Sequence, residues 1–350
     1  MQRWALPSRK RPIVAIGAGG IMRDAHLPAY RACGFDVIGV YDPDLPRADA
    51  LARDFGIGRV FKSSTEAVAQ TDVVFDVAVP PDAIESLLES LPEHSAVLIQ
   101  KPFGRDLGEA TRLLAVCRRR RLTAAVNFQL RFAPGMLALR DLVTRGVLGT
   151  ITDVDVLVRC RMPWELWPFL AGLPRMELPL HSIHYLDAIR GLVGDPRGVY
   201  ARTVKHPGSP ELASSKSSVI LDYGDFVRAS LATNHHHDFG DAHHRSELTL
   251  EGTDGCAKLR MGVNLDYPRG RSDTLDVVRR GGAWESIPLV GAWFPDAFRG
   301  PMCNLQRFID GEDAMLLSPV EDAFKTMALV EACHSSNDRG GVPIPPTPPA

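Results

Sequence analysis

The sequence predicts an α/β protein in which an N-terminal Rossmann domain, a doubly wound parallel sheet, is followed by an α/β domain with a large, mostly antiparallel sheet. Two observations lead to this prediction. In the first third of the chain, short apolar runs alternate with helical stretches, as in a parallel sheet covered by helices on both faces. Beyond about residue 150, apolar and polar residues alternate between turn signals, as in antiparallel strands with one open face.

Five apolar runs predict the parallel strands. They are nearly continuous in Val, Ile and Ala, because a strand covered on both faces has no side in contact with water. The runs span residues 12–16, 36–41, 73–79, 96–100 and 122–128. Helical stretches such as 45–55 and 107–121 separate them, so we expect a Rossmann domain at residues 1–127.

Seven alternating segments predict the strands of the second sheet. They span residues 152–160, 198–204, 217–223, 225–234, 246–252, 256–261 and 274–280. Two helices accompany them, one over 176–190 and one at about 318–338 near the C-terminus. We expect residues 128–350 to form the second domain.

The composition excludes several classes of protein. Hydrophobic residues make up 45% of the 350 residues and charged residues 23%, which is ordinary for a soluble globular protein. A net charge of −2 offers no basic surface for nucleic acid. The sequence contains no run of about twenty apolar residues, so it predicts no membrane span. The six cysteines are scattered without a CxxC pair, which indicates reduced thiols and a cytoplasmic protein.

A glycine-rich loop, GAGGIM, follows the first apolar run and opens a helical segment. A GxG at this place lets the backbone approach a pyrophosphate at a helix N-terminus. Met22 stands where a third small residue is usual. The predicted cofactor contacts in the loop are Gly17, Gly19, Gly20, Ile21 and Met22.

Asp42 ends the second strand at about the interval expected for the acidic partner of such a loop. A carboxylate there accepts hydrogen bonds from ribose hydroxyls and repels a 2′-phosphate, so NAD is favoured over NADP. The alternative for Gly17 and Gly19 is a tight turn without a ligand.

The run AVLIQKPFG ends a buried strand with Gln100, Lys101 and Pro102. Ligands of doubly wound sheets lie outside the carboxyl ends of the strands, so Lys101 is expected to point into the cofactor crevice. The alternative is a lysine that reaches solvent from a strand end.

The run of IGAGGIM, AHLPAY, VYDPD, AVPP, IQKPFG, RFAP, HSIHYLD and LEGTDG resembles the Gfo/Idh/MocA oxidoreductases, which include glucose–fructose oxidoreductase and inositol dehydrogenase. The match covers nearly the whole chain in the family's order. The resemblance implies pyridine-nucleotide chemistry on sugars, cyclitols or related polyols. It also places cofactor contacts at Pro80, Gln100, Lys101 and Gln129.

The resemblance assigns Lys101 to the family's essential lysine and Pro102 to a proline often found in cis. Gln100 replaces the usual glutamate, and the loss of that carboxylate predicts a more acidic Lys101. His184 matches the family's histidine and Asp187 its last aspartate. The first aspartate of that motif falls on Leu180, so one expected carboxylate is missing.

Helical spacing would place Glu177, His181 and His184 on one face, with Asp187 beside His184. Three interpretations remain open for this helix. His184 can accept the proton of a carbinol hydroxyl, while Lys101 steadies the developing alkoxide. The four side chains can instead bind a metal, although the spacing is not HExxH and the resemblance requires none. The third interpretation is a polar helix face.

Predicted substrate contacts are Lys101, Arg131, Trp164, His181, His184 and His235. Trp164 offers an aromatic face to a sugar ring, with core packing as the alternative. Arg131 has the alternative of a salt bridge at the domain boundary. His235 belongs to a histidine-rich stretch, 234–244, that we interpret as a substrate rim or subunit interface; solvent exposure and metal binding are its alternatives.

Taken together, these residues predict an NAD-dependent dehydrogenase that oxidises a secondary hydroxyl of a sugar, glycoside or cyclitol. Two alternatives stay open: an enzyme that uses tightly bound NAD transiently for elimination or glycoside cleavage, and a non-catalytic NAD-binding sensor. We expect a homodimer or homotetramer formed through the second sheet.

Overall fold

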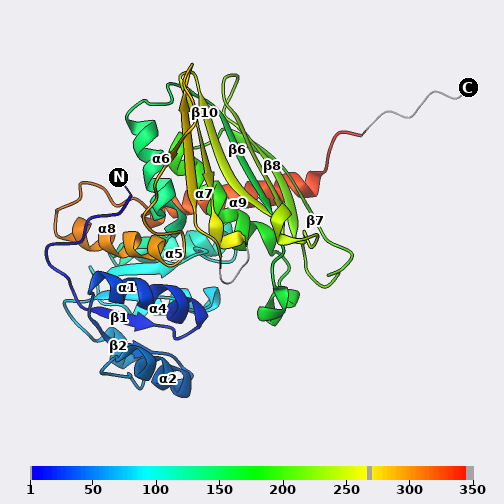
Figure 1. Ribbon diagram of the computed structural model, residues 1–350. Helices are drawn as coiled ribbons and strands as arrows, with labels where there is room; N and C mark the ends of the chain where they lie inside the picture. Colours follow the sequence, from blue (N-terminus) through cyan, green and yellow to red (C-terminus); the bar gives the residue numbers. More distant parts are fainter. Residues whose placement is uncertain (1, 266–269, 344–350) are drawn as a thin grey trace, which may run out of the picture.

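The computed structural model describes residues 2–265 and 270–343 and contains two sheets (Figure 1). The first sheet is parallel, with strand order β2-β1-β3-β4-β5. Its strands are β1 (Ile13–Ile16), β2 (Val37–Tyr41), β3 (Val74–Val77), β4 (Ala96–Gln100) and β5 (Thr123–Asn127). β1 and β3 are buried along their whole length. The predicted Rossmann sheet is therefore confirmed.

Helices connect these strands as a doubly wound sheet requires. They are α1 (Leu27–Cys33), α2 (Leu45–Phe55), α3 (Ser64–Val68), α4 (Pro81–Ser90) and α5 (Leu107–Arg119), with a π-helical turn at Met22–His26. Local sequence sets their ends. Asp44 accepts a hydrogen bond from the Arg47 amide at the start of α2, and Gly56 ends that helix in the left-handed conformation.

The second sheet has eight strands in the order β13-β12-β11-β10-β6-β9-β8-β7. All neighbours are antiparallel except β6 and β9. The strands are β6 (Ile151–Arg159), β7 (Gly198–Val204), β8 (Lys216–Asp222), β9 (Arg228–Asn234), β10 (Arg245–Gly252), β11 (Gly255–Arg260), β12 (Thr274–Arg279) and β13 (Glu285–Ile287). The predicted mostly antiparallel sheet is confirmed; the short β13 was not predicted.

Helices α6 (Pro134–Thr144), α7 (Ile183–Val193) and α9 (Val320–Arg339) contact one face of this sheet (Figure 1). Strand residues with alternate spacing, such as Val154, Val156 and Val158, are buried. The opposite face exposes Tyr200 and Ile220, which are directly paired across β7 and β8. Within the described residues, no helix is long and apolar enough to cross a membrane.

Helix α8 (Arg299–Ile309) lies beside the N-terminal sheet although it comes late in the chain (Figure 1). It contacts α1, β4 and β5. The sequence interpretation did not predict this helix, which begins at Arg299 and has Gly300 and Pro301 in its first turn, two residues that usually interrupt a helical pattern. The division of the chain at residues 127 and 128 stays a prediction, since the N-terminal sheet is covered partly by later residues.

The remaining helical turns are short. They are the 3-10 turns η2 (Gln129–Phe132), η3 (Trp164–Leu166), η4 (Pro168–Gly172), η6 (Asp241–His243), η7 (Gly262–Asn264) and η8 (Asp296–Phe298), and the π-helical turn η5 (Leu178–Ser182). Directly before α9, the Val126 amide of β5 donates to the Ser318 carbonyl at 2.8 Å, and the Ser318 hydroxyl donates to the Val126 carbonyl at 2.6 Å. This late segment therefore covers the edge strand of the N-terminal sheet.

Candidate active site

The glycine loop begins where β1 ends. Gly17 has φ +105°, and a Cβ added to it would lie 2.2 Å from the Ala78 carbonyl oxygen, so only glycine fits. Around Gly19, by contrast, nothing lies within 4 Å of an added Cβ. The loop thus packs tightly against β3 on one side and leaves its backbone open at Gly19, as a backbone cradle for a pyrophosphate requires. The Met22 side chain is fully buried in the core.

Asp42 connects this loop to the end of β2. Its carboxylate accepts hydrogen bonds from the Ala18 amide at 2.8 Å, the Asp44 amide at 2.9 Å and the Arg47 guanidinium at 2.7 Å. Burial alone would raise the pKa of Asp42, but these hydrogen bonds offset it and the pKa is lowered. Asp42 is therefore ionised at neutral pH. The sequence interpretation did not select Arg47.

Three buried amide oxygens lie at or just past the carboxyl ends of β4 and β5. Gln100 Oε1, Asn127 Oδ1 and Gln129 Oε1 have no hydrogen-bond partner among the described residues. Buried polar atoms are normally satisfied, so this group of free acceptors is what a polar ligand would complete. Together with the open backbone at Gly19, they fit the nicotinamide nucleotide that a Rossmann sheet binds at this edge. Pro80, another predicted contact, is exposed just before α4.

A buried network behind this edge was missed by the sequence interpretation. His26 Nδ1 lies 2.7 Å from Asp76 Oδ2, which also accepts a hydrogen bond from the Tyr30 hydroxyl at 2.7 Å. Because Nδ1 donates to the carboxylate, Nε2 accepts from Asn127 Nδ2 at 3.1 Å. This fixes the Asn127 amide with its oxygen free. The available signal was Asp76, an acid inside an otherwise apolar strand.

Lys101 follows β4 and is joined to Pro102 by a cis peptide bond. Its ammonium donates a hydrogen bond of 2.9 Å to the carbonyl oxygen of Leu180. Removal from water lowers the pKa of Lys101 to about 8. The expected direction of this shift is confirmed, although its cause is burial of the ammonium.

His184 lies on α7 and is buried. Its ring meets Trp293 edge-on at 5.6 Å between centroids, and its Nδ1 has no partner among the described residues. Burial, and then the nearby Lys101 ammonium, lower the pKa of His184 well below 6.5. The imidazole is therefore neutral at physiological pH and able to accept a proton or a hydrogen bond.

The predicted helix over 176–190 is helical from Glu177 on, but it is not regular in its first half. A π-helical turn, Leu178–Ser182, precedes α7 and changes the angular spacing. Glu177 is bound by Ser182 Oγ at 2.8 Å and Thr233 Oγ1 at 2.9 Å. Asp187 does not hydrogen-bond His184 in the described structure; it pairs with Arg131 instead.

Three of the predicted substrate residues are brought together beside this turn. The His181 ring lies 4.7 Å from that of His235 and 5.5 Å from that of Trp164. His235 Nε2 lies 3.3 Å from Glu177 Oε1, and its Nδ1 is 3.7 Å from the Cys160 sulfur. Burial would lower the pKa of His235, but these two contacts outweigh it and raise the pKa to about 9. Burial and the neighbouring His235 lower the pKa of His181 well below 6.5.

Leu180 shows what replaces the expected carboxylate. Its side chain packs in an apolar cluster with Leu170, Met176 and Leu212, while its backbone carbonyl receives Lys101. A neutral carbonyl therefore stands where the family motif has an acid.

Arg131 forms no hydrogen bond with the other predicted substrate residues in the described structure. Its guanidinium binds Asp187 at 2.6 and 2.7 Å, Asp322 at 2.6 Å and the Leu317 carbonyl at 2.9 Å. These contacts match the alternative given for Arg131, a structural salt bridge. A substrate contact by Arg131 stays a prediction. In the described parts of the chain, no group of three or more His, Cys, Asp or Glu side chains is arranged to hold a metal ion.

A Rossmann sheet with a glycine loop, an acidic residue at the end of β2 and a lysine at the end of β4 defines an NAD-binding oxidoreductase. Two family models match the chain: the oxidoreductase family with an NAD-binding Rossmann fold over residues 12–128, and the GFO/IDH/MocA C-terminal domain over residues 136–258. The protein belongs to the GFO/IDH/MocA oxidoreductase family, as its sequence motifs predicted.

Similar proteins include sugar dehydrogenases. D-apiose dehydrogenase of Paraburkholderia graminis is 25% identical in a 336-residue alignment that covers 93% of this chain and 87% of that protein. D-glucoside 3-dehydrogenase of Escherichia coli is 28% identical over 55% of this chain and 56% of that protein. An oxidoreductase from Agrobacterium radiobacter, crystallised with NAD+, L-tartaric acid and magnesium, has the same fold, with a TM-score of 0.79, 20% identity and coverage of 95% of this chain and 98% of that chain.

Proposed function

We propose that the protein is an NAD-dependent dehydrogenase that oxidises a secondary hydroxyl of a sugar, glycoside or cyclitol. The observation that carries this proposal is the pair of Lys101 and His184. The Lys101 ammonium donates a hydrogen bond to the Leu180 carbonyl, and the neutral His184 follows Leu180 by four residues. The similarity to dehydrogenases that act on apiose and glucosides supports a carbohydrate substrate.

The chemistry that NAD supplies when bound is acceptance of a hydride from the substrate carbon. Gly17, Gly19, Gly20, Ile21, Met22 and Asp42 would hold the dinucleotide, with Pro80, Gln100, Lys101 and Gln129 at its nicotinamide end. His184 accepts the hydroxyl proton, because a neutral imidazole is the only form able to do so. The Lys101 ammonium donates a hydrogen bond to the same oxygen and stabilises its developing negative charge. Trp164, His181 and His235, whose rings contact one another, would form the wall against which a sugar ring packs.

The pKa of Lys101 suits this role. Near pH 7 the group is mostly protonated, and the loss of a neighbouring carboxylate leaves its charge free for the substrate oxygen. A carbonyl partner holds the side chain in place without neutralising it.

A screen of polyols and glycosides for NADH absorbance, run beside a nucleotide-content assay of the purified protein, tests the proposal. Substrate-dependent formation of NADH with added NAD, and less with NADP, is expected. Cofactor that co-purifies and is not consumed while a sugar is converted would identify transient use of NAD instead. Nucleotide binding without turnover of any substrate would favour a sensor.

We also propose that the chain self-associates through the open face of the second sheet, as a homodimer or homotetramer. Tyr200, Val204 and Ile220 expose 68%, 45% and 54% of their surface on adjacent strands of that face. Apolar side chains clustered on one flat sheet face are typical of a protein contact. The six cysteines are free thiols, which supports a reducing, cytoplasmic setting.

A further inference from the structure

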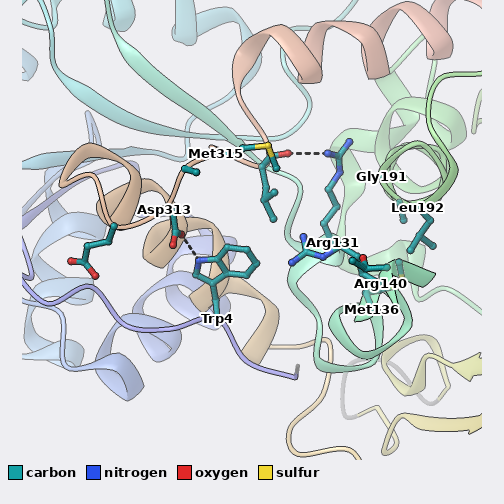
Figure 2. Close-up of a pocket in the computed structure, with 13 residues that line it drawn as sticks. Trp4, Arg131, Met136, Arg140, Gly191, Leu192, Asp313 and Met315 are labelled. Carbon is teal, nitrogen blue, oxygen red and sulfur yellow. Dashed lines mark hydrogen bonds between the residues drawn. The ribbon is translucent and has the colours of Figure 1, made fainter. Parts of the chain in front are cut away.

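A pocket of about 510 Å³ lies where α6, α7 and the loop before α9 meet the N-terminal segment (Figure 2). Its walls include Trp4, Met136, Leu192 and Met315, so much of the lining is apolar. Of the proposed substrate residues, it shares only Arg131, and it includes none of the proposed cofactor residues. Its volume is in the range of pockets that hold small molecules.

Most charges in this wall are already paired. Arg131 is bound by Asp187 and Asp322. The two acids of the wall, Glu312 and Asp313, both bind Arg307, at 2.6 and 2.8 Å. Asp313 also accepts a hydrogen bond from the Trp4 indole at 2.8 Å (Figure 2).

Arg140 is the exception. Its guanidinium extends toward the ring of Trp4, 5.1 Å from the ring centroid (Figure 2). Among the residues that the structure describes, it has no carboxylate partner and no hydrogen-bond acceptor. Partial burial and the like charge of Arg131 lower the pKa of Arg140. A partly desolvated cation without an acid is costly, and an anion in the pocket would remove that cost.

We propose that this pocket binds a small organic monocarboxylate, with the carboxylate on Arg140 and its apolar body against Trp4, Met136, Leu192 and Met315. The guanidinium fork matches the geometry of a carboxylate. A single negative charge is favoured over a dianion such as phosphate, because Glu312 and Asp313 lie in the same wall and would repel a second charge.

Benzoate, with the isosteric neutral amide benzamide as its control, tests the proposal by isothermal titration calorimetry. We expect saturable binding of benzoate to the wild-type protein and at least about tenfold weaker binding of benzamide. Arg140→Gln should weaken benzoate binding by a similar factor. Arg145→Gln, which removes an exposed arginine from the end of the same helix, is the matched control and should leave binding unchanged.

Lys101→Met should also bind benzoate as tightly as the wild type, because the pocket is separate from the proposed catalytic residues. Loss of binding in this variant would place the carboxylate in the catalytic cleft and overturn the proposal. So would equal affinity of Arg140→Gln, equal affinity for benzamide, or no saturable binding at all.

A second measurement does not depend on any variant folding. In wild-type protein carrying ¹³C-methyl methionine, benzoate should shift the Met136 and Met315 methyl resonances, because both side chains line the pocket. The methyl of Met22, buried in the N-terminal core, should not move. Shifts that spare Met136 and Met315 would contradict binding at this place.

Discussion

The ammonium of Lys101 is held at 2.9 Å by the backbone carbonyl of Leu180, the residue at which the family motif carries an aspartate. The π-helical turn Leu178–Ser182 contains this carbonyl, and the Leu180 side chain is turned into an apolar cluster. The partner of the Lys101 ammonium is therefore a neutral carbonyl and not a carboxylate. The ammonium is therefore anchored on a neutral acceptor, and its burial lowers the pKa of Lys101 to about 8.

Removing either member of the catalytic pair should abolish most turnover. Lys101→Met and His184→Ala are each expected to lower kcat/KM by about 10²-fold or more, because a hydrogen-bond donor or a proton acceptor to the reacting oxygen is lost. Steady-state NADH formation measures the effect. Lys62→Met and His243→Ala, at exposed positions, are the controls. Near wild-type turnover in either active-site variant would remove that residue from the mechanism.

The pH dependence of kcat/KM should show an alkaline limb near pH 8. The pKa of His184 lies well below 6.5, so its neutral form persists as pH rises, whereas Lys101 loses its proton at about pH 8 and with it the hydrogen-bond donor. Activity should be flat around pH 7 and decline above about 8. Lys101→Arg stays charged, so its residual activity should lack that limb. An increase through pH 8 would instead identify neutral Lys101 as the base.

Restoring a carboxylate beside Lys101 should move this limb. Gln100→Glu places a negative charge next to the ammonium and favours its charged form, so the limb should shift upward by about one pH unit. The neutral Gln100→Met is the control for packing. If both variants shift the limb equally, the charge is not the cause.

The Glu177–His235 pair should contribute strongly to stability. Both side chains are buried, and replacement of Glu177 by Gln should lower the free energy of unfolding at neutral pH by about 3–5 kcal/mol. Urea unfolding measures this. Glu85→Gln breaks an exposed ion pair with Arg112 and should cost less than about 1 kcal/mol. If both variants lose the same free energy of unfolding, the buried Glu177–His235 pair contributes no more to stability than the exposed pair.

The contribution of this pair should also depend on pH. The pKa of His235 is raised from 6.5 to about 9, so its stabilising effect is complete below pH 6.5 and is lost as pH rises through 9. The pKa of Glu177 is lowered, so its effect is present above its usual value of 4.5 and is lost in acid. The deficit of His235→Gln relative to wild type should therefore shrink between pH 6.5 and 9.

Self-association should depend on the exposed apolar pair of β7 and β8. Ile220→Asp puts a charge opposite Tyr200 and should yield a smaller species by size-exclusion chromatography with light scattering. Ser218→Asp, on the same strand and also exposed, tests whether any charge on this face has the same effect. An unchanged mass for Ile220→Asp would place the subunit contact elsewhere.

The sheets were predictable because their signals are local: apolar runs for buried parallel strands and alternation for the second sheet. Lys101 and Asp42 could be placed near each other because the carboxyl ends of parallel strands meet at one edge of the sheet, while their roles stay predictions. The Glu177–His235 contact could not, since its partners are 58 residues apart and only the packed fold joins them. The π-helical turn at the start of the histidine helix could not be predicted, because no sequence rule revealed it. Arg140 could not be selected from the sequence, because only the folded structure shows that its guanidinium has no carboxylate partner among the described residues.

The hydrogen bonds between Val126 and Ser318 join residues that are 192 positions apart. During synthesis, the N-terminal sheet emerges from the ribosome long before the segment that covers its edge strand, and before α8. The edge strand of the nascent domain therefore stays uncovered until the segment that contains Ser318 has been made. The N-terminal sheet can therefore reach its final packing only after residues far along the chain have been synthesised.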